Sequence, residues 1–236
     1  MRRTLRVMTF NIHAGVGLDG RYDLERIAAI VNAVRPDLAG FQEVDRRYDE
    51  RSQFDDQPAV LAELTGMVPC YGPTIVRGSK EYGNLILSRL PILSTRATAL
   101  PSTLEARGLL EAVVDLGGSA LTFFDVHLGL GTGAAERTPQ ALEVAARIDA
   151  APVPRVLVGD VNVQPPAEEL VPLLDRLRDV WPGAGEGEGL TIPAATPRFR
   201  IDLVLVEPGV QTLRAWIVPT DASDHLPVVC DLEVTA

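Results

Sequence analysis

Apolar residues recur along the chain in runs whose spacing predicts nine β-strands. In some runs apolar and polar residues alternate, and in others the apolar residues follow one another; both patterns are typical of strands with a buried face. The predicted strands are Leu5–Asn11, Asp37–Gln42, Asn84–Ser88, Leu109–Asp115, Ala120–His127, Arg155–Asp160, Ile201–Glu207, Leu213–Val218 and Pro227–Val234. Several of them follow one another directly, which favours two packed sheets.

Four segments between these strands have the apolar spacing of helices. In the segment 23–34, the residues Leu24, Ile27, Val31 and Val34 fall on one face, and the Arg-Pro pair that follows ends the pattern. The other predicted helices are Pro58–Leu64, Ala134–Ile148 and Ala167–Leu177. Because strands and helices are interspersed, we predict an α/β (α+β) protein in which two packed mixed sheets are flanked by helices.

The composition fits one globular domain. The chain has 236 residues, of which 46% are hydrophobic and 23% are charged, which is enough apolar material for one core. The glycine-rich stretch Pro182–Gly189 is too short to separate domains, so we predict a single domain over residues 1–236. No apolar run approaches the roughly 20 residues of a membrane helix. The alternating N-terminal stretch is typical of a strand rather than a signal peptide.

Charge and cysteine content bear on partners and compartment. The formal net charge is -10, and Lys80 is the only lysine. An acidic surface repels polyanions, which argues against a nonspecific nucleic-acid-binding protein. Cys70 and Cys230 lie far apart and have no zinc-ligand spacing, so we expect a cytoplasmic protein with reduced thiols.

Polar side chains gather where the predicted strands end or begin. The set is Asn11, His13, Gln42, Glu43, His127, Asp160, Asn162, Asp202, Asp224 and His225, and it includes all three histidines. Each residue alone has a simpler interpretation, because Asp and Asn are common in turns and a lone histidine is usually a core residue. As a set, however, the carboxylates and amides are the hard oxygen ligands that Mg²⁺ and Mn²⁺ prefer. Histidines beside carboxylates can serve phosphate binding and proton transfer.

Seven short blocks carry a resemblance to a known family. They are TFNIH, GFQEVD, YGNLILSR, DVHL, GDVN, RIDLVL and SDHLPV, and they lie in this order between Thr9 and Val228. In this order the blocks resemble those of the endonuclease/exonuclease/phosphatase superfamily of metal-dependent phosphoesterases. The resemblance implies a four-layer α/β/β/α sandwich, which agrees with the pattern of strands and helices above.

The resemblance also implies a role for each main polar residue. Asp160 corresponds to the residue that activates the attacking water, and Asn162 to the amide that holds a phosphoryl oxygen. Asp202 corresponds to the carboxylate that orients His225. His127 corresponds to a histidine that acts as general acid or phosphate ligand.

A divalent metal is implied by the same resemblance. Glu43 corresponds to the principal metal ligand, with Asn11 beside it and Asp224 near the metal. The expected ion is Mg²⁺ or Mn²⁺. His13 stands where some relatives have an acidic ligand for a second metal, which leaves the number of ions open.

Three further residues have open roles. Arg107 precedes a strand at a place where relatives often carry a phosphate-contacting arginine, and a surface arginine is the alternative. Asn84 could line the cleft and contact the substrate phosphate. Glu81 could pair with His127, although a solvated turn is the more ordinary interpretation.

Three functions are compatible with the sequence. The first is a Mg²⁺- or Mn²⁺-dependent phosphodiesterase or phosphatase, expected to be a monomer, that acts on a small phosphoester or a phospholipid head group. The second is a metal-dependent DNA endonuclease or exonuclease, which the acidic charge disfavours. The third is a non-catalytic module that binds a phosphate ligand in the same cleft. Substrate choice would depend on loops such as Gly15–Arg21 and Glu50–Gln57.

Overall fold

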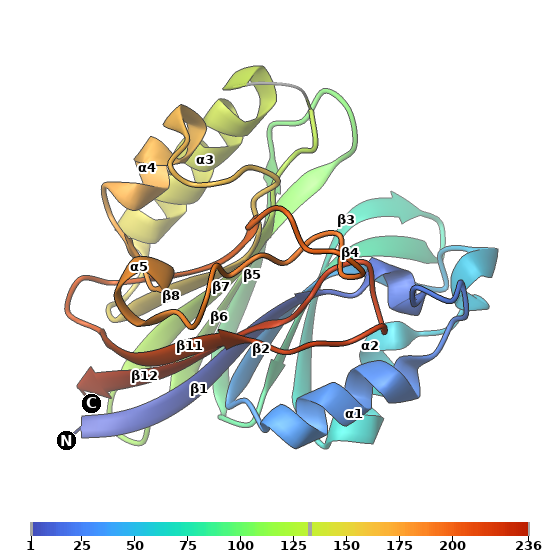
Figure 1. The fold of residues 1–236 in the computed structure, drawn as a ribbon, viewed down its shortest axis with the longest axis horizontal. Coiled ribbons are helices and arrows are strands. Elements are labelled where there is room, and N and C mark those ends of the chain that lie inside the picture. Colours follow the sequence, from blue (N-terminus) through green and yellow to red (C-terminus); the bar gives the residue numbers. More distant parts are fainter. Residues whose placement is uncertain (1, 132–133, 236) are drawn as a thin grey trace.

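Two six-stranded sheets packed face to face form the centre of the molecule (Figure 1). The computed structural model describes residues 2–131 and 134–235. The first sheet has the order β11-β12-β1-β2-β4-β3, with bounds Gln211–Ile217, Val228–Thr235, Arg2–Asn11, Leu38–Arg46, Lys80–Ser88 and Val68–Arg77. The second has the order β5-β6-β7-β8-β10-β9, with bounds Ile92–Leu100, Arg107–Asp115, Ala120–His127, Arg155–Asp160, Asp202–Val206 and Arg178–Asp179.

Helices cover the outer face of each sheet. The first sheet carries α1 (Leu24–Val34) and α2 (Gln57–Thr65), and the second carries α3 (Ala134–Ala150) and α4 (Val171–Leu174). The remaining helical elements are α5 (Trp181–Ala184) and the 3-10 turns η1 (His13–Gly15), η2 (Glu50–Ser52) and η3 (Glu168–Leu170). The layers run helix, sheet, sheet, helix, so the predicted sandwich is confirmed. Among the described residues, no helix is both long and apolar enough to cross a membrane.

Three buried apolar clusters fill the three interfaces between these layers. Strand β1 contributes to two of them. Leu5 and Val7 point into the core between the sheets, whereas Met8 and Phe10 belong to the core under α1 and α2. Because successive side chains of a strand face opposite sides, one alternating run of sequence can build both cores.

Three strands, β3, β5 and β9, were not predicted, and one predicted helix differs from the structure. β5 is an edge strand whose side chains are mostly exposed, so its sequence has no apolar period. β3 is also an edge strand, and it contains Pro69, Gly72 and Pro73, residues that weaken any strand prediction. The predicted helix Ala167–Leu177 is instead the turn η3 followed by α4, because Pro172 lacks the backbone N–H needed to continue one helix.

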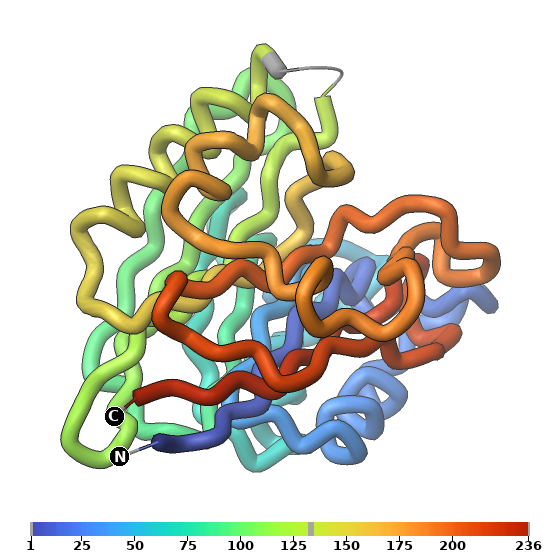
Figure 2. Tube along the Cα trace, turned by 60° about the vertical axis from the view of Figure 1, so that its left-hand side comes forward, coloured from blue at the N-terminus to red at the C-terminus, as the bar shows by residue number. Residues whose placement is uncertain are grey.

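The strand order brings distant parts of the sequence to one end of the sheets. β1 pairs in parallel with β2 and antiparallel with β12, and the two ends of the chain therefore lie side by side (Figure 2). In the second sheet, His127, Asp160 and Asp202 are direct neighbours across β7, β8 and β10. The side chain of Asn11, the last residue of β1, contacts Asp160, so the polar ends of both sheets meet.

Candidate active site

Asn11 joins the two sheets at their polar ends. Its amide nitrogen Nδ2 donates to Oε1 of Glu43 at 3.2 Å and to Oδ2 of Asp160 at 3.1 Å. Its Oδ1 accepts from the backbone N–H of His13 at 3.1 Å, which fixes the orientation of the amide. Glu43 lies on β2 of the first sheet and Asp160 on β8 of the second. The site therefore exists only when the two sheets are packed together.

Glu43 and Asn162 have backbone conformations that direct their side chains. Their φ angles are 60° and 53°, in the left-handed region that costs an L-residue on the order of 1 kcal/mol or more. Glu43 lies at a β2 bulge between Phe41 and Val44, and bulges re-aim side chains. Asn162 follows Asp160 in a turn, where Oδ1 of Asp160 accepts from the backbone N–H of Asn162 at 2.9 Å.

The glycine of the GDVN block is required by the packing of β8 on β7. Gly159 has a φ of 146°, and a Cβ added to it would lie 1.9 Å from the carbonyl oxygen of Val126. Only glycine allows this approach of the two backbones. The approach sets the position of Asp160, the next residue.

Asp160 is the centre of the site and is only 1% exposed. Burial raises its pKa most strongly, and the negative charge of Asp202 raises it further. The charge of His225 and the hydrogen bonds from Asn162 and Asn11 act in the opposite direction, and the resulting pKa is about 7. A carboxyl group with such a pKa exchanges protons with water near neutral pH.

His225 pairs with Asp202, as the family resemblance implies. Its Nδ1 lies 2.9 Å from Oδ2 of Asp202. Burial alone would lower the pKa of His225, but the charge and hydrogen bond of Asp202 outweigh it, together with the charges of Asp160 and Asp224, and raise the pKa to about 10. The imidazole is therefore cationic at neutral pH, with an N–H on both nitrogens.

Ser223 positions the loop that carries His225. Its hydroxyl donates to the backbone oxygen of Asn11 at 2.8 Å and accepts from the backbone N–H of His225 at 3.2 Å. Sequence reasoning missed this residue, whose only signal was its place at the start of the SDHLPV block.

At its Nδ1, His127 faces a cation instead of a carboxylate. Its Nδ1 lies 3.0 Å from Nη1 of Arg107. A guanidinium group only donates, so Nδ1 accepts and the proton of the neutral ring is on Nε2. Burial lowers the pKa of His127 well below its usual range, and the positive charges of Arg107 and His225 lower it further. His127 is thus neutral at physiological pH.

The structure bears on two open alternatives about the surroundings of His127. Arg107 is not a surface residue, because it is 7% exposed and pairs with Glu105 at 2.7 Å in addition to His127. Glu81 does not pair with His127 but with Arg46, at 3.0 Å.

The two imidazoles converge on Asp160. Nε2 of His127 lies 3.6 Å and Nε2 of His225 lies 3.7 Å from Oδ2 of Asp160. Asn162 borders the same point, because its Nδ2 donates to the carbonyl of Leu128 at 3.0 Å and lies 3.1 Å from Nε2 of His127. Several N–H donors therefore surround one carboxylate oxygen, an arrangement that suits an anionic ligand.

The site also has the donor groups of a metal centre. Asp160, Asp202 and His225 offer ligand-type atoms that all lie within 4.8 Å of one another. Asp202 and His225 already bond each other, so the carboxylate of Glu43, with Asp160 beside it across the Asn11 amide, is the better fit to a hard cation. The oxygens of this set are of the kind that Mg²⁺ and Mn²⁺ prefer.

Asp224 and Asn84, two other residues predicted for the site, differ in their exposure to solvent. Asp224 is half-exposed, and its Oδ1 lies 3.9 Å from Nδ1 of His13 at the edge of the site. Asn84 is 2% exposed, and its Nδ2 donates to the backbone oxygens of Gly108 and Asp125. The structure does not bring Asn84 into the cleft, so its expected contact with a substrate phosphate has no support from the geometry.

A polar cavity of about 440 Å³ opens beside the strand ends. Its lining includes Glu43, Arg51, Tyr82 and Arg107. Arg51 is held by two hydrogen bonds to Asp45, at 3.2 and 3.3 Å, and lies over the Tyr82 ring with 5.8 Å to its centroid. Sequence reasoning missed Arg51, whose only signal was its place in a predicted specificity loop.

A second cavity, of about 570 Å³, has a different character. Asn162 lines it together with apolar residues that include Ile192, Phe199 and Ile201. Leu130 lines both cavities, so the two lie next to each other at the site.

The fold and the polar site together define a class of protein. A sequence model described as the Endonuclease/Exonuclease/phosphatase family matches residues 8–225, which include every residue of the site. The chain therefore belongs to the endonuclease/exonuclease/phosphatase family. Members of this family are generally hydrolases of phosphoester bonds and typically depend on a divalent metal.

Solved structures with the same fold include proteins of several kinds. An endonuclease/exonuclease/phosphatase from Beutenbergia cavernae DSM 12333 is 30% identical with a TM-score of 0.86, over 99% of this chain and 72% of that chain. The mannosyl-6-phosphatase of Bacteroides thetaiotaomicron is 18% identical with a TM-score of 0.78, over 97% and 99% of the two chains. D. rerio TDP2 complexed with a single strand DNA product is 20% identical with a TM-score of 0.76, over 98% and 99%. The last two show a shared fold alone. No functionally curated protein matches the chain in sequence.

Proposed function

We propose that this protein is a divalent-metal-dependent hydrolase of phosphoester bonds that acts on a small phosphoester. The observation that carries the proposal is the buried carboxylate of Asp160 beside the Nε2 atoms of His127 and His225, at 3.6 and 3.7 Å. Hydrolysis at phosphorus requires a base for the attacking water and donors for the phosphoryl oxygens on which negative charge grows. This arrangement supplies both.

Each residue has a part in the proposed reaction. Asp160 takes the proton of the attacking water, for which a pKa of about 7 is well suited. The cationic His225, oriented by Asp202, donates from Nε2 to a phosphoryl oxygen. The neutral His127 donates from Nε2 to the same group, which supports the role of phosphate ligand over that of general acid. The amide of Asn162 donates one N–H to the backbone carbonyl of Leu128, and its Nδ2 lies 3.1 Å from Nε2 of His127, so the amide stands beside the proposed phosphoryl oxygen.

The metal ligands in the proposal are Glu43, Asn11 and Asp224, and the ion is Mg²⁺ or Mn²⁺. The carboxylates of Glu43 and Asp160 both lie within hydrogen-bond distance of the Asn11 amide, and a divalent cation near them would offset their mutual repulsion. When bound, such an ion neutralises negative charge on a phosphoryl oxygen.

A small phosphoester suits the charge of the protein better than DNA does. The net charge is -10. The lining of the polar cavity contains the carboxylates of Glu43, Asp49 and Glu105 as well as Arg51 and Arg107, so a ligand with many phosphates would meet repulsion there. We therefore do not propose a DNA nuclease. A phosphate-binding module without activity is the alternative that the experiment below excludes.

The compartment and assembly state belong to the same proposal. Cys70 and Cys230 are free and buried, which suits a cytoplasmic protein. We propose that the chain acts there as one monomeric catalytic domain, and light scattering of the purified protein tests the assembly state.

The proposal is tested with a panel of phosphoesters and one pair of variants. Wild-type protein should hydrolyse at least one small phosphoester with Mg²⁺ or Mn²⁺ and lose this activity when a chelator is added. Glu43→Ala should weaken Mn²⁺ binding in calorimetry and lower activity by at least about tenfold, because it removes a ligand and a charge. Glu63→Ala, on the exposed face of α2, is the control and should change neither.

Two outcomes would contradict the proposal. Binding of phosphoesters without metal-dependent turnover of any of them would favour the phosphate-binding module. An unchanged Mn²⁺ titration of Glu43→Ala would remove this residue from the metal site.

A further inference from the structure

The apolar cavity beside Asn162 differs from the rest of the site in its chemistry. Seven of its nine lining residues are apolar, and they include Val163, Ile192, Phe199 and Ile201. The cavity reaches the reaction centre itself, because Asn162 is in contact with His127. A group attached to a phosphorus atom at that centre would therefore enter the cavity directly.

Hydrogen bonds fix the position of the segment that forms the wall of this cavity. Ile192 and Phe199 face each other as a bridged pair, with Phe199 N donating to Ile192 O at 3.0 Å and Ile192 N donating to Phe199 O at 3.2 Å. The backbone N–H of Arg200 donates to Oε1 of Gln164 at 2.9 Å, which ties this segment to the turn after Asn162. The wall is thus held in place by hydrogen bonds of its own backbone.

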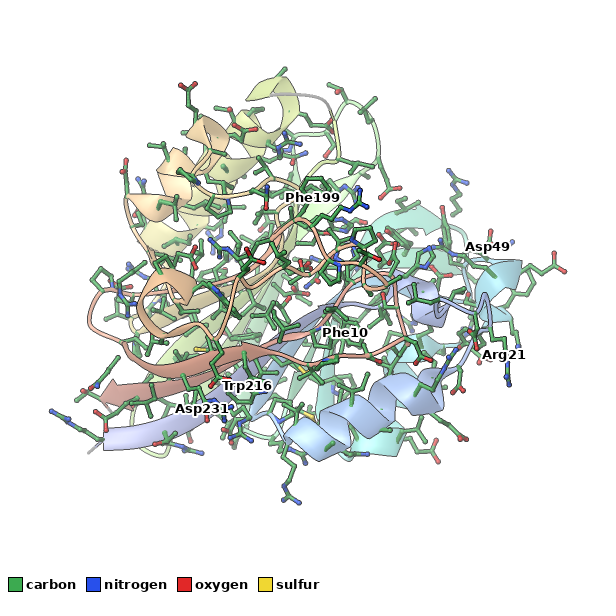
Figure 3. All side chains as sticks on the ribbon, viewed as in Figure 1. Phe10, Arg21, Asp49, Phe199, Trp216 and Asp231 are labelled. Atoms are coloured by element: carbon green, nitrogen blue, oxygen red, sulfur yellow. The ribbon has the colours of Figure 1, made fainter. Side chains whose placement is uncertain are left out.

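Apolar surface is exposed along the cavity. Phe199 is 50% exposed and Leu130 is 74% exposed. Figure 3 labels Phe199 on the loop that precedes β10, away from α1 and α2. Single exposed apolar residues are common, but two of them at one mostly apolar cavity next to a reactive centre are typical of a ligand site.

The polar cavity beside Leu130 has a lining of the opposite chemical character to that of the apolar cavity. That cavity contains Glu43, Arg51, Glu105 and Arg107, so a polar substituent has a place there. The two cavities share Leu130, and each contains one residue in contact with His127, which is Arg107 in the polar cavity and Asn162 in the apolar one. A substrate with one apolar ester group would bind in one orientation only, with that group against Phe199.

We infer that the cavity beside Asn162 is a subsite for an apolar organic group, alkyl or aryl, that is esterified to the substrate phosphate. The inference rests on the proposed phosphoester hydrolase and narrows its substrate class. Sugar phosphates without an apolar group would leave the subsite empty and bind more weakly.

The test is a calorimetric binding series with Mg²⁺ present. The probes are inorganic phosphate and methyl, propyl and hexyl phosphate, with phenyl phosphate as the aryl member. In wild-type protein the Kd should fall by about three- to fourfold for each added methylene group, until the cavity is filled. Stronger binding of phenyl than of hexyl phosphate would assign the subsite to aryl groups, and the reverse order would assign it to alkyl groups.

Two variants show which residues of the cavity cause the dependence of Kd on chain length. Phe199→Ala should weaken binding of hexyl phosphate by about tenfold and leave that of methyl phosphate unchanged, because only the long chain reaches the ring. Ile192→Ala should have a smaller effect of the same kind. The control is Leu213→Ala on β11, because Leu213 is 45% exposed, close to the 50% of Phe199, and lines neither cavity.

The outcomes separate this inference from the function on which it rests. A Kd that does not depend on chain length in the wild type would overturn the subsite while leaving the phosphate site intact. Equal chain-length dependence in Phe199→Ala and Leu213→Ala would also overturn it. Failure of both inorganic phosphate and methyl phosphate to bind would overturn the proposed function, and the subsite with it.

Discussion

His127 and His225 lie at nearly equal distances from the same oxygen of Asp160, and both are almost completely buried. Their pKa values nevertheless move in opposite directions. The difference originates at Nδ1, which faces the guanidinium of Arg107 in one ring and the carboxylate of Asp202 in the other. Burial disfavours the charged form of both rings, and only the ring with an anionic partner overcomes it.

The comparison shows how one residue type takes two roles in one site. The cationic His225 lowers the pKa of His127, so a second positive charge is disfavoured beside the first. Both rings still present an N–H from Nε2. The N–H of His225 therefore brings a full positive charge toward a phosphate, whereas the N–H of His127 brings only a dipole. The partner at Nδ1 determines the charge of each ring.

Asp160 links the two histidines, so its replacement should have the largest effect. Asp160→Asn removes the proposed base and should lower kcat by a factor on the order of 10² or more, with a much smaller change in substrate binding. It should also lower the pKa of His225, because the charge of Asp160 helps to raise it. Steady-state kinetics at saturating metal and an NMR titration of His225 measure the two effects.

An exposed carboxylate on the same loop as His225 provides the control. Asp221→Asn should leave kcat and the histidine titration unchanged. Activity of Asp160→Asn within about threefold of wild type would show that Asp160 is not the base.

The layers, and the convergence of several polar residues at the strand ends, could be predicted from the sequence because both depend on local patterns. The alternation of Val7, Met8 and Phe10 determines which side of β1 each side chain faces, and polar residues at strand ends mark the site. The contact between Arg107 and His127 was not predictable in this way. It depends on the register of β6 against β7, and the period of each strand does not determine that register.

His225 is the histidine whose Nδ1 faces an anionic partner, Asp202. His225→Ala should lower kcat by a factor on the order of 10², and Asp202→Asn by somewhat less. With its pKa of about 10, wild-type His225 stays cationic through neutral pH. Loss of the Asp202 charge lowers that pKa, so the alkaline limb of the rate profile should move to lower pH.

A double-mutant cycle and a stability profile complete this test. The double variant should be little worse than His225→Ala, and fully additive losses would show that the pair does not act as a unit. The pKa of His225 rises from 6.5 to about 10 in the folded protein, so its contribution to stability is fully present below about pH 6.5 and is lost as the pH rises toward 10. The difference in Tm between wild type and Asp202→Asn should narrow over that range.

Arg107 is the cationic partner at Nδ1 of the other histidine, His127, and its replacement should have the smallest effect. Arg107→Met removes the donor at Nδ1 of His127 and a positive charge beside it, so the pKa of His127 should rise toward its usual value. The ring would then lose its fixed tautomer, and kcat should fall by about tenfold through loss of orientation. Arg107→Lys keeps the charge without the planar guanidinium, so the pKa of His127 should stay low. Nitrogen NMR of the His127 ring separates this positioning role from the phosphate contact predicted by sequence resemblance. If Arg107 binds phosphate instead, Arg107→Met should raise KM and leave the tautomer of His127 unchanged.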